Sequence, residues 1–149
     1  MKKNYLRSKR GVSLIEVITV IAIIGILSGI SVSGYFYYKK SSELALNVQQ
    51  TANMIRKAKA NAVSVAEDSQ WGVNIENNKV TVFKGGVFFG RDTSFDEAVS
   101  ISGVDGVSGI TQIIFTKFTG VPSVTGSTTL ASGSENKSLQ INEAGTISY

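Results

Sequence analysis

The sequence predicts an α+β protein in which one long N-terminal helix, with a membrane half and an amphipathic half, packs on a small, mostly antiparallel β head. Residues 17–38 carry no charge and are mostly apolar, and residues 41–66 contain neither glycine nor proline. After residue 70 the apolar residues change from helical spacing to an alternation of period two, which is typical of strands. These three observations divide the chain into a membrane segment, an amphipathic helix and a β-rich head.

The positive charge of the 149-residue chain is concentrated at its N-terminus. Five of its 15 basic residues lie within residues 1–10, where there is no acid. The rest of the chain is therefore close to neutral and has no global attraction for a phosphate backbone. The sequence contains no cysteine and no histidine, which excludes His-dependent nucleophilic catalysis, disulfides and zinc sites of the usual N/S type.

Residues 17–38 are long enough to cross a membrane as a helix. At about 1.5 Å per residue the run spans about 33 Å, against about 30 Å for the hydrocarbon core. Residues 35–38 would form an interfacial aromatic belt, and the larger positive charge before the run places the N-terminus in the cytoplasm. Three simpler interpretations compete: a secretory signal cleaved near Ser31–Ser33, a plain signal anchor and a buried core helix.

None of these interpretations explains Glu16, which interrupts the apolar stretch near its start. A charged residue costs about 2.5–3.5 kcal/mol at the middle of a membrane, less near an interface, and therefore needs a partner. Cleavage after Gly11 would create an α-amine on Val12, which is a cation at the same end of the helix.

Residues 11–27, GVSLIEVITVIAIIGIL, follow a basic leader and resemble the N-terminal signature of type IV pilins and type II secretion pseudopilins. The resemblance implies that prepilin peptidase cuts between Gly11 and Val12 and methylates the new N-terminus on Val12. It also implies that Glu16 is the assembly carboxylate, which pairs with the N-terminus of a neighbouring subunit.

The chain departs from the family pattern at two positions. Val12 stands where the family usually has Phe, and Ser33, followed by Gly34, stands where a helix-kinking proline is often found. Serine and glycine can still loosen a helix, which leaves local melting on assembly undecided. Gly25 and Gly29 form a GxxxG pattern that predicts a helix-packing face, although small residues are common in membrane helices.

The chain is predicted to hold four segments: a cleaved leader (1–11), a transmembrane and assembly half of the helix (12–38), an amphipathic half (39–66) and a β-rich head (67–149). We expect one nearly continuous helix from about Ser13 to Ala66, with apolar residues at three- and four-residue steps on one face of its second half. Arg56, Lys57 and Lys59 are expected on a solvated face, with contact to anionic lipid or DNA as the alternative.

The head is predicted to hold several short strands separated by Gly-, Ser- and Thr-rich loops. The strands are expected at 71–75, 79–83, 87–89, 98–101, 110–118 and 138–141, with a closing hairpin of 139–142 and 146–149. The loops are expected at 103–109, 120–126 and 132–138. Trp71 is interpreted as a core aromatic. The strand that begins at Trp71-Gly72, together with the closing hairpin, resembles the GspH/FimT-type branch of minor pseudopilins.

The acids of the head give little support to a catalytic or metal site. Asp92, Asp96, Glu97 and Asp105 are the densest acids, but they do not follow a calcium-loop pattern, so we interpret them as surface acids. A calcium site and a hydrolytic carboxylate pair remain the alternatives. Residues 103–109 are glycine-rich but lack lysine, which argues against a phosphate loop.

Taken together, these observations and the resemblance lead us to expect a minor pseudopilin. We expect it to be a structural subunit and not an enzyme, and to have no cofactor. The implied partners are prepilin peptidase, other pilin or pseudopilin subunits, the inner-membrane assembly platform and membrane lipid. A DNA-binding competence pseudopilin is the first alternative and a membrane-anchored hydrolase the second. The basic residues of the head, which nucleic acid would require, are scattered: Lys79, Lys84, Arg91, Lys117 and Lys137.

Overall fold

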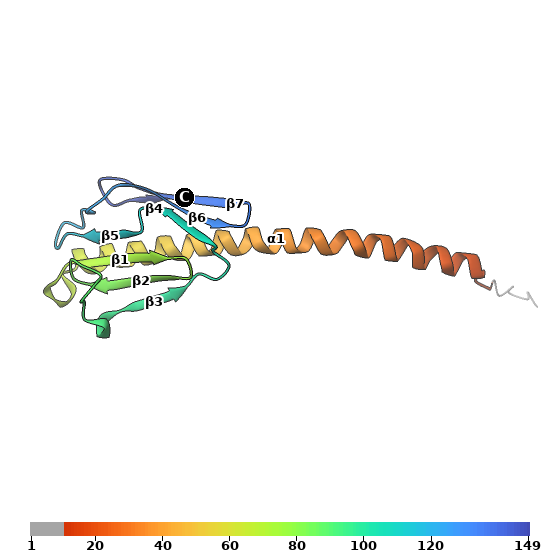
Figure 1. The fold of residues 1–149 in the computed structure, drawn as a ribbon, viewed down its shortest axis with the longest axis horizontal. Coiled ribbons are helices and arrows are strands. Elements are labelled where there is room, and N and C mark those ends of the chain that lie inside the picture. The colour runs from red at the N-terminus through yellow and green to blue at the C-terminus, as the bar shows by residue number, and fades with distance from the viewer. Residues whose placement is uncertain (1–10) are drawn as a thin grey trace, which may run out of the picture. The chain divides into compact units, whose positions relative to one another are not determined.

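Helix α1, Leu14–Val63, is the longest element of the computed structural model, which describes residues 11–149 apart from the side chains of residues 30–33 (Figure 1). The single helix expected from about Ser13 to Ala66 is confirmed, with an end three residues earlier. The chain divides into two units, Met1–Tyr38 and Lys39–Tyr149. Residues 1–10 of the predicted leader lie outside the described residues.

A strained turn ends α1. Val65, Glu67 and Asp68 have positive φ angles of 57°, 54° and 51°, in the left-handed region that glycine usually occupies after a helix. Contacts that hold this turn include a hydrogen bond from the indole Nε1 of Trp71 to the carbonyl of Ala66 at 2.9 Å and an ion pair between Asp68 and Lys117. Trp71 is buried in the core, as predicted.

The second unit contains two four-stranded sheets, in which all neighbouring strands are antiparallel. Sheet A has the order β3-β2-β1-β5, and sheet B has the order β4-β6-β7-β8. The strands of sheet A are β1 (Trp71–Glu76), β2 (Lys79–Lys84), β3 (Glu97–Ser100) and β5 (Gln112–Phe115). Those of sheet B are β4 (Gly106–Gly109), β6 (Gly126–Ser132), β7 (Glu135–Ile141) and β8 (Ile147–Ser148). The antiparallel α+β architecture is therefore confirmed.

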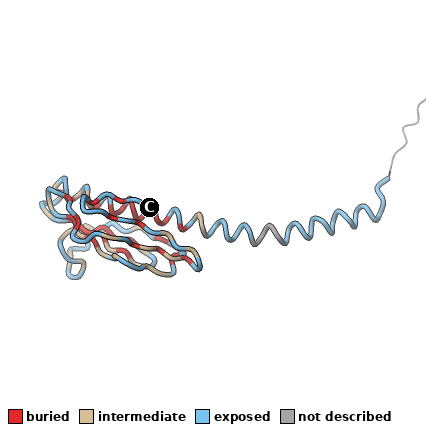
Figure 2. Tube along the Cα trace, turned by 90° about the horizontal axis from the view of Figure 1, so that it is seen from above, coloured by how far each residue is buried: buried red, intermediate tan, exposed pale blue. Residues whose placement is uncertain are grey.

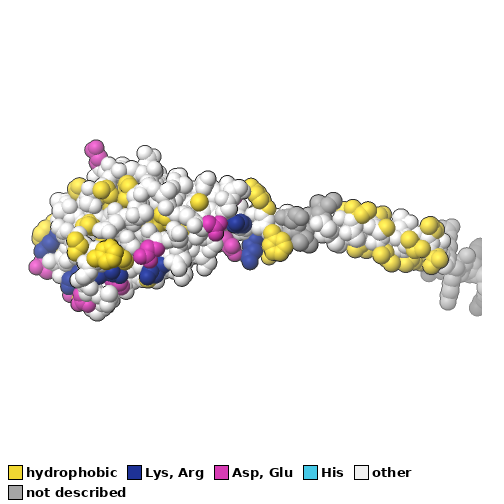
Figure 3. Space-filling view, in the orientation of Figure 1, with side chains coloured by type: hydrophobic (Ala, Val, Ile, Leu, Met, Phe, Trp, Pro, Cys, Tyr) yellow, Lys and Arg dark blue, Asp and Glu magenta, His cyan; other side chains and the backbone are white. Residues whose placement is uncertain are grey.

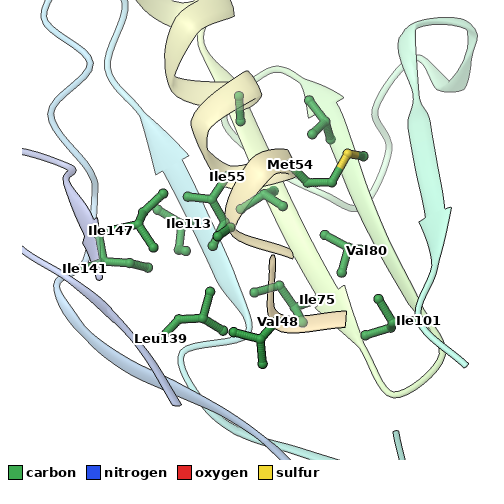
Figure 4. Close-up of a cluster of buried hydrophobic side chains, with 14 of the residues drawn as sticks. Val48, Met54, Ile55, Ile75, Val80, Ile101, Ile113, Leu139, Ile141 and Ile147 are labelled. Atoms are coloured by element: carbon green, nitrogen blue, oxygen red, sulfur yellow. The ribbon is translucent and has the colours of Figure 1, made fainter. Parts of the chain in front are cut away.

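The core of the second unit lies between α1 and the two sheets. Along the helix, buried residues recur on one face from Leu44 to Ala62, and Figure 2 shows them alternating with exposed ones. Side chains from the helix and from both sheets point toward one another in Figure 4, where Ile55, Ile75 and Leu139 represent the three layers. Three layers thus share one apolar core, and its burial is the main source of stability for this unit.

The face of sheet A away from the helix is also covered. Phe83 alternates with the core residue Val82, so its ring points to the other face, yet it is fully buried. Residues 85–96, which we call the strap, provide part of this cover: the Phe88 ring lies 5.3 Å from that of Phe83. A glycine is required at position 72, beneath the Phe83 ring, because a Cβ there would overlap that ring.

Arg91 holds the strap together. Its Nε and Nη2 donate to the two carboxylate oxygens of Asp96 at 2.8 and 2.6 Å, and its Nη1 donates to the Phe88 carbonyl at 2.7 Å. The guanidinium carbon also lies 3.6 Å from the centre of the Phe88 ring. Within the strap a 3-10 turn, Thr93–Phe95, is capped by the Asp92 side chain, which accepts from the Ser94 amide.

Several predicted strands and loops of the head are wrong. Residues 87–89 form no strand, because Phe88 turns onto Phe83 while Gly85 and Gly90 on either side take positive φ angles. The strand expected at 110–118 is confined to β5, because the chain turns at Lys117 and Phe118. The segments 103–109 and 132–138, expected as loops, contain β4 and the start of β7, and β6 was not predicted. The β7–β8 hairpin is confirmed.

Candidate processing and assembly site

The segment from Gly11 to Glu16 leads into the first turn of α1. The carbonyl of Ser13 accepts from the amides of Glu16 and Val17 at 3.1 and 3.3 Å, which starts the helix. A Cβ at Gly11 would meet nothing within 4 Å, so the packing of the described residues places no demand for glycine there. A requirement for glycine at this position would have to come from another molecule.

Glu16 lies in the first turn of α1, where the helix dipole favours a negative charge. Its side chain is exposed and, with Val12, Val17, Val20 and Ile21, lines a shallow depression of about 230 Å³. Among the described residues, no lysine or arginine forms an ion pair with Glu16. The Glu16 carboxylate therefore lies among apolar side chains, and residues 11–149 supply no cation that pairs with it.

The apolar surface of the first unit is exposed over most of its described length. Val12 is 72% exposed and Leu14 is 78% exposed, and apolar side chains cover much of this helix in Figure 3. An 18-residue stretch of α1 has a mean hydropathy of 2.4, and none of it is buried. By length and composition this helix can cross a membrane.

Polar side chains within this apolar helix bond to the helix itself. The hydroxyls of Thr19 and Ser28 each donate to the carbonyl four residues earlier, at 2.7 Å. Such bonds satisfy hydroxyls that would have no water in a hydrocarbon environment. This stretch can therefore face lipid or other helices without leaving these two hydroxyls unsatisfied.

Gly25 and Gly29 lie four residues apart, on one side of α1. A Cβ at either position would meet nothing within 4 Å, so neither glycine is needed for packing inside this chain. Their role in packing against another helix remains a prediction, as does melting near Ser33-Gly34, where the Ser33 side chain lies outside the described residues.

The acids considered for calcium or hydrolysis do not converge. Asp96 pairs with Arg91, Glu97 pairs with Lys57, and Asp105 accepts from the amide of Gly133 at 2.7 Å. Donation from the hydroxyl and amide of Ser94 lowers the pKa of Asp92. In the described part of the chain, no group of three or more carboxylates is placed to hold one metal ion.

Most basic residues considered for nucleic acid are engaged by carboxylates. Lys79 pairs with Glu76 at 3.7 Å, Lys84 pairs with Glu67 at 3.5 Å, and Lys117 pairs with Asp68. Arg91 is bound to Asp96, as described above. Of these five basic residues of the head, Lys137 forms no ion pair with any of residues 11–149. The head therefore does not present these cations together as a basic patch.

The basic cluster of α1, Arg56, Lys57 and Lys59, has more varied surroundings than the sequence suggests. Lys57 pairs with Glu97, whereas Lys59 reaches across to the carbonyls of Ala144 and Gly145. Sequence reasoning placed all three on one solvated face. No local pattern connects residue 59 with residues 144–145, so sequence reasoning could not have found this contact.

Residues 6–32 match the family model described as the prokaryotic N-terminal methylation motif. The match contains Gly11, Val12 and Glu16, together with the apolar start of α1. No curated protein and no solved structure matches the chain.

Proposed function

We propose that this chain, which carries the N-terminal methylation motif at residues 6–32, is a subunit of the type IV pilin and pseudopilin family that prepilin peptidase processes. We further propose that it serves as a minor pseudopilin of a secretion or pilus system. The observation that carries the proposal is the match at residues 6–32, on a helix whose apolar surface is exposed. The closing hairpin of the head supports a GspH/FimT-like branch.

Each residue of the N-terminal segment has a proposed role. Cleavage falls between Gly11 and Val12, and Val12 carries the methyl group. Glu16 then pairs with the N-terminus of the neighbouring subunit, which supplies the cation that residues 11–149 do not provide. Gly25 and Gly29 allow close approach of a second helix.

The proposed location is the inner membrane, with the N-terminus in the cytoplasm and the head outside it, and then the pilus or pseudopilus after assembly. Membrane lipid and the inner-membrane assembly platform are the proposed surroundings before assembly. The role is structural and requires no cofactor. DNA binding ranks below it, because most cations of the head are engaged by carboxylates.

The N-terminal mass of the protein recovered from the membranes of its host tests this proposal. We expect a mature chain that begins at Val12 and carries one added methyl group. Gly11→Ala should largely block cleavage while leaving membrane insertion intact, because the peptidase and not the fold requires glycine there. An intact Met1, or a cut near Ser33, in the wild-type chain would overturn the assignment.

A further inference from the structure

A groove of about 450 Å³ lies in the second unit between α1 and the turn that joins β7 to β8. Arg56, Lys59 and Val63 line it from the helix, and Gly145–Ile147 line it from the hairpin. The groove therefore combines two cationic side chains with apolar carbon surface.

The walls of the groove are fixed to each other. Lys59 Nζ donates to the carbonyl oxygens of Ala144 and Gly145 at 2.6 and 3.3 Å, which ties the hairpin to the helix. Gly145 has a φ of 67°, and a Cβ there would lie 3.1 Å from the carbonyl oxygen of Gly120. These contacts connect the two walls of the groove to each other.

No carboxylate among the described residues pairs with either cation of the groove. Arg56 donates to the side-chain oxygen of Asn53 at 3.1 Å, and its guanidinium carbon lies 5.7 Å from the centre of the Tyr149 ring. Neither Arg56 nor Lys59 forms an ion pair within the described part of the chain, although Lys57 beside them does. Two positive charges therefore face the groove with only neutral partners.

We propose that this groove receives an acidic side chain carried on an apolar segment of a neighbouring pilin-type subunit. A carboxylate between Arg56 and Lys59 would gain charge-assisted hydrogen bonds, while Val63 and Ile147 would contact its apolar neighbours. Two cations are too few for a phosphate backbone, which is bound by many phosphate contacts. The inference rests on the proposed function for the class of its partner.

Carbodiimide coupling tests the proposal, because it joins an amine to a carboxylate only where the two are in contact. The full chain is cross-linked in the membranes of its host, and peptides that contain Lys59 are identified by mass spectrometry. We expect an amide between Lys59 and an Asp or Glu of another chain that bears the N-terminal methylation motif, a second copy included. Lys59→Arg keeps the charge and should abolish this product.

Charge reversal separates a specific contact from general attraction. Arg56→Glu should lower the yield of the interchain product about tenfold, because it places a negative charge beside the incoming carboxylate. Lys79→Glu is the matched control: it makes the same change of charge on β2 and should leave the yield unchanged. Thermal unfolding of each variant checks that the head is folded.

Two results would overturn the inference: coupling of Lys59 only within its own chain, or equal yields from Arg56→Glu and Lys79→Glu. Retention of DNA by the wild-type chain that Arg56→Glu abolishes would also overturn it, in favour of a nucleic-acid site. If Val12 is the mature N-terminus and Lys59 joins no other subunit, this inference fails while the proposed function stands. An intact Met1 removes the proposed function itself.

Discussion

Two buried threonines of the head differ in the bonding of their hydroxyls. Thr81 on β2 is 2% exposed, and its Oγ1 is the buried side-chain atom without a hydrogen-bond partner among the described residues. Thr128 on β6 is fully buried, but its Oγ1 donates to the carbonyl of Ile110 at 2.5 Å. A buried hydroxyl without a partner costs about 1–3 kcal/mol, whereas a bonded one contributes about 1 kcal/mol.

Replacement of each threonine by valine should therefore change stability in opposite directions. Thr81→Val should raise the free energy of unfolding by about 1 kcal/mol, and Thr128→Val should lower it by a similar amount. Urea unfolding of the full chain in detergent measures both. A loss of stability in Thr81→Val as large as that in Thr128→Val would mean that the Thr81 hydroxyl is bonded.

Asp68, in the turn that follows α1, gives a prediction about how stability depends on pH. Lys117 lowers the pKa of Asp68 below its usual value of 3.8, first through a hydrogen bond and then through its charge. The folded pKa lies below the unfolded one, so the contribution of the carboxylate is complete above the unfolded pKa and is lost as pH falls through the folded pKa. The Tm advantage of wild type over Asp68→Asn should be constant from about pH 5 to 7 and should shrink below about pH 4.

The strap shows how one side chain organises a segment whose regular structure is limited to a single 3-10 turn. Arg91 is 15% exposed, and it joins Asp96 to the Phe88 carbonyl while it stacks on the Phe88 ring. Phe89, in contrast, is 90% exposed at the next position. The strap is therefore held by the geometry of a planar, forked cation.

A lysine cannot reproduce that geometry, although it keeps the charge. Arg91→Lys should destabilise the head by about 1–2 kcal/mol and increase proteolytic cleavage within residues 85–96. Limited proteolysis and urea unfolding measure the two effects. Lys79→Arg, at an exposed ion pair, is the control that should change neither. Unchanged cleavage in Arg91→Lys would mean that aromatic packing alone holds the strap.

The elements with strong apolar patterns could be predicted from the sequence, and those without such patterns could not. In β1 and β2 the apolar residues identify the strands, and the Asn77-Asn78 turn fixes their pairing. In β6 the buried positions are Thr128, Leu130 and Ser132, so only one large apolar residue marks the strand. It forms because β4 and β7 pair with it on either side, which no local pattern reveals.

For the whole molecule, the methylation motif could be identified from the sequence because its residues are contiguous. Gly11, Val12 and Glu16 lie within six residues of one another, and the motif match contains all three. The groove on α1 could not be predicted, because Lys59 and Gly145 meet only through the tertiary fold. Contiguous recognition signals can be read from a sequence, whereas surfaces assembled from distant segments require the structure.

The assembly role proposed for Glu16 gives a prediction for the full-length chain. Glu16→Ala should leave cleavage after Gly11 largely intact, because the carboxylate is five residues beyond the cut. It should lower incorporation into filaments about tenfold or more, because the N-terminal amine of the neighbour loses its counter-charge. Recovery in sheared or cross-linked filaments measures this effect. Wild-type recovery would remove the charge-pairing role.

The double cover of sheet A also has a consequence for how the head opens. Its central strands β1 and β2 are each paired with a strand on both sides, while α1 covers one face and the strap covers part of the other at Phe83. Solvent therefore reaches their amides only after these strands separate from their neighbours. Amide hydrogens that become accessible only when the whole head unfolds exchange most slowly with deuterium. Amide hydrogens of strands at the edge of a sheet exchange early. The slowest-exchanging amides of the head should accordingly lie in β1 and β2, and those of the short edge strand β8 should exchange long before them.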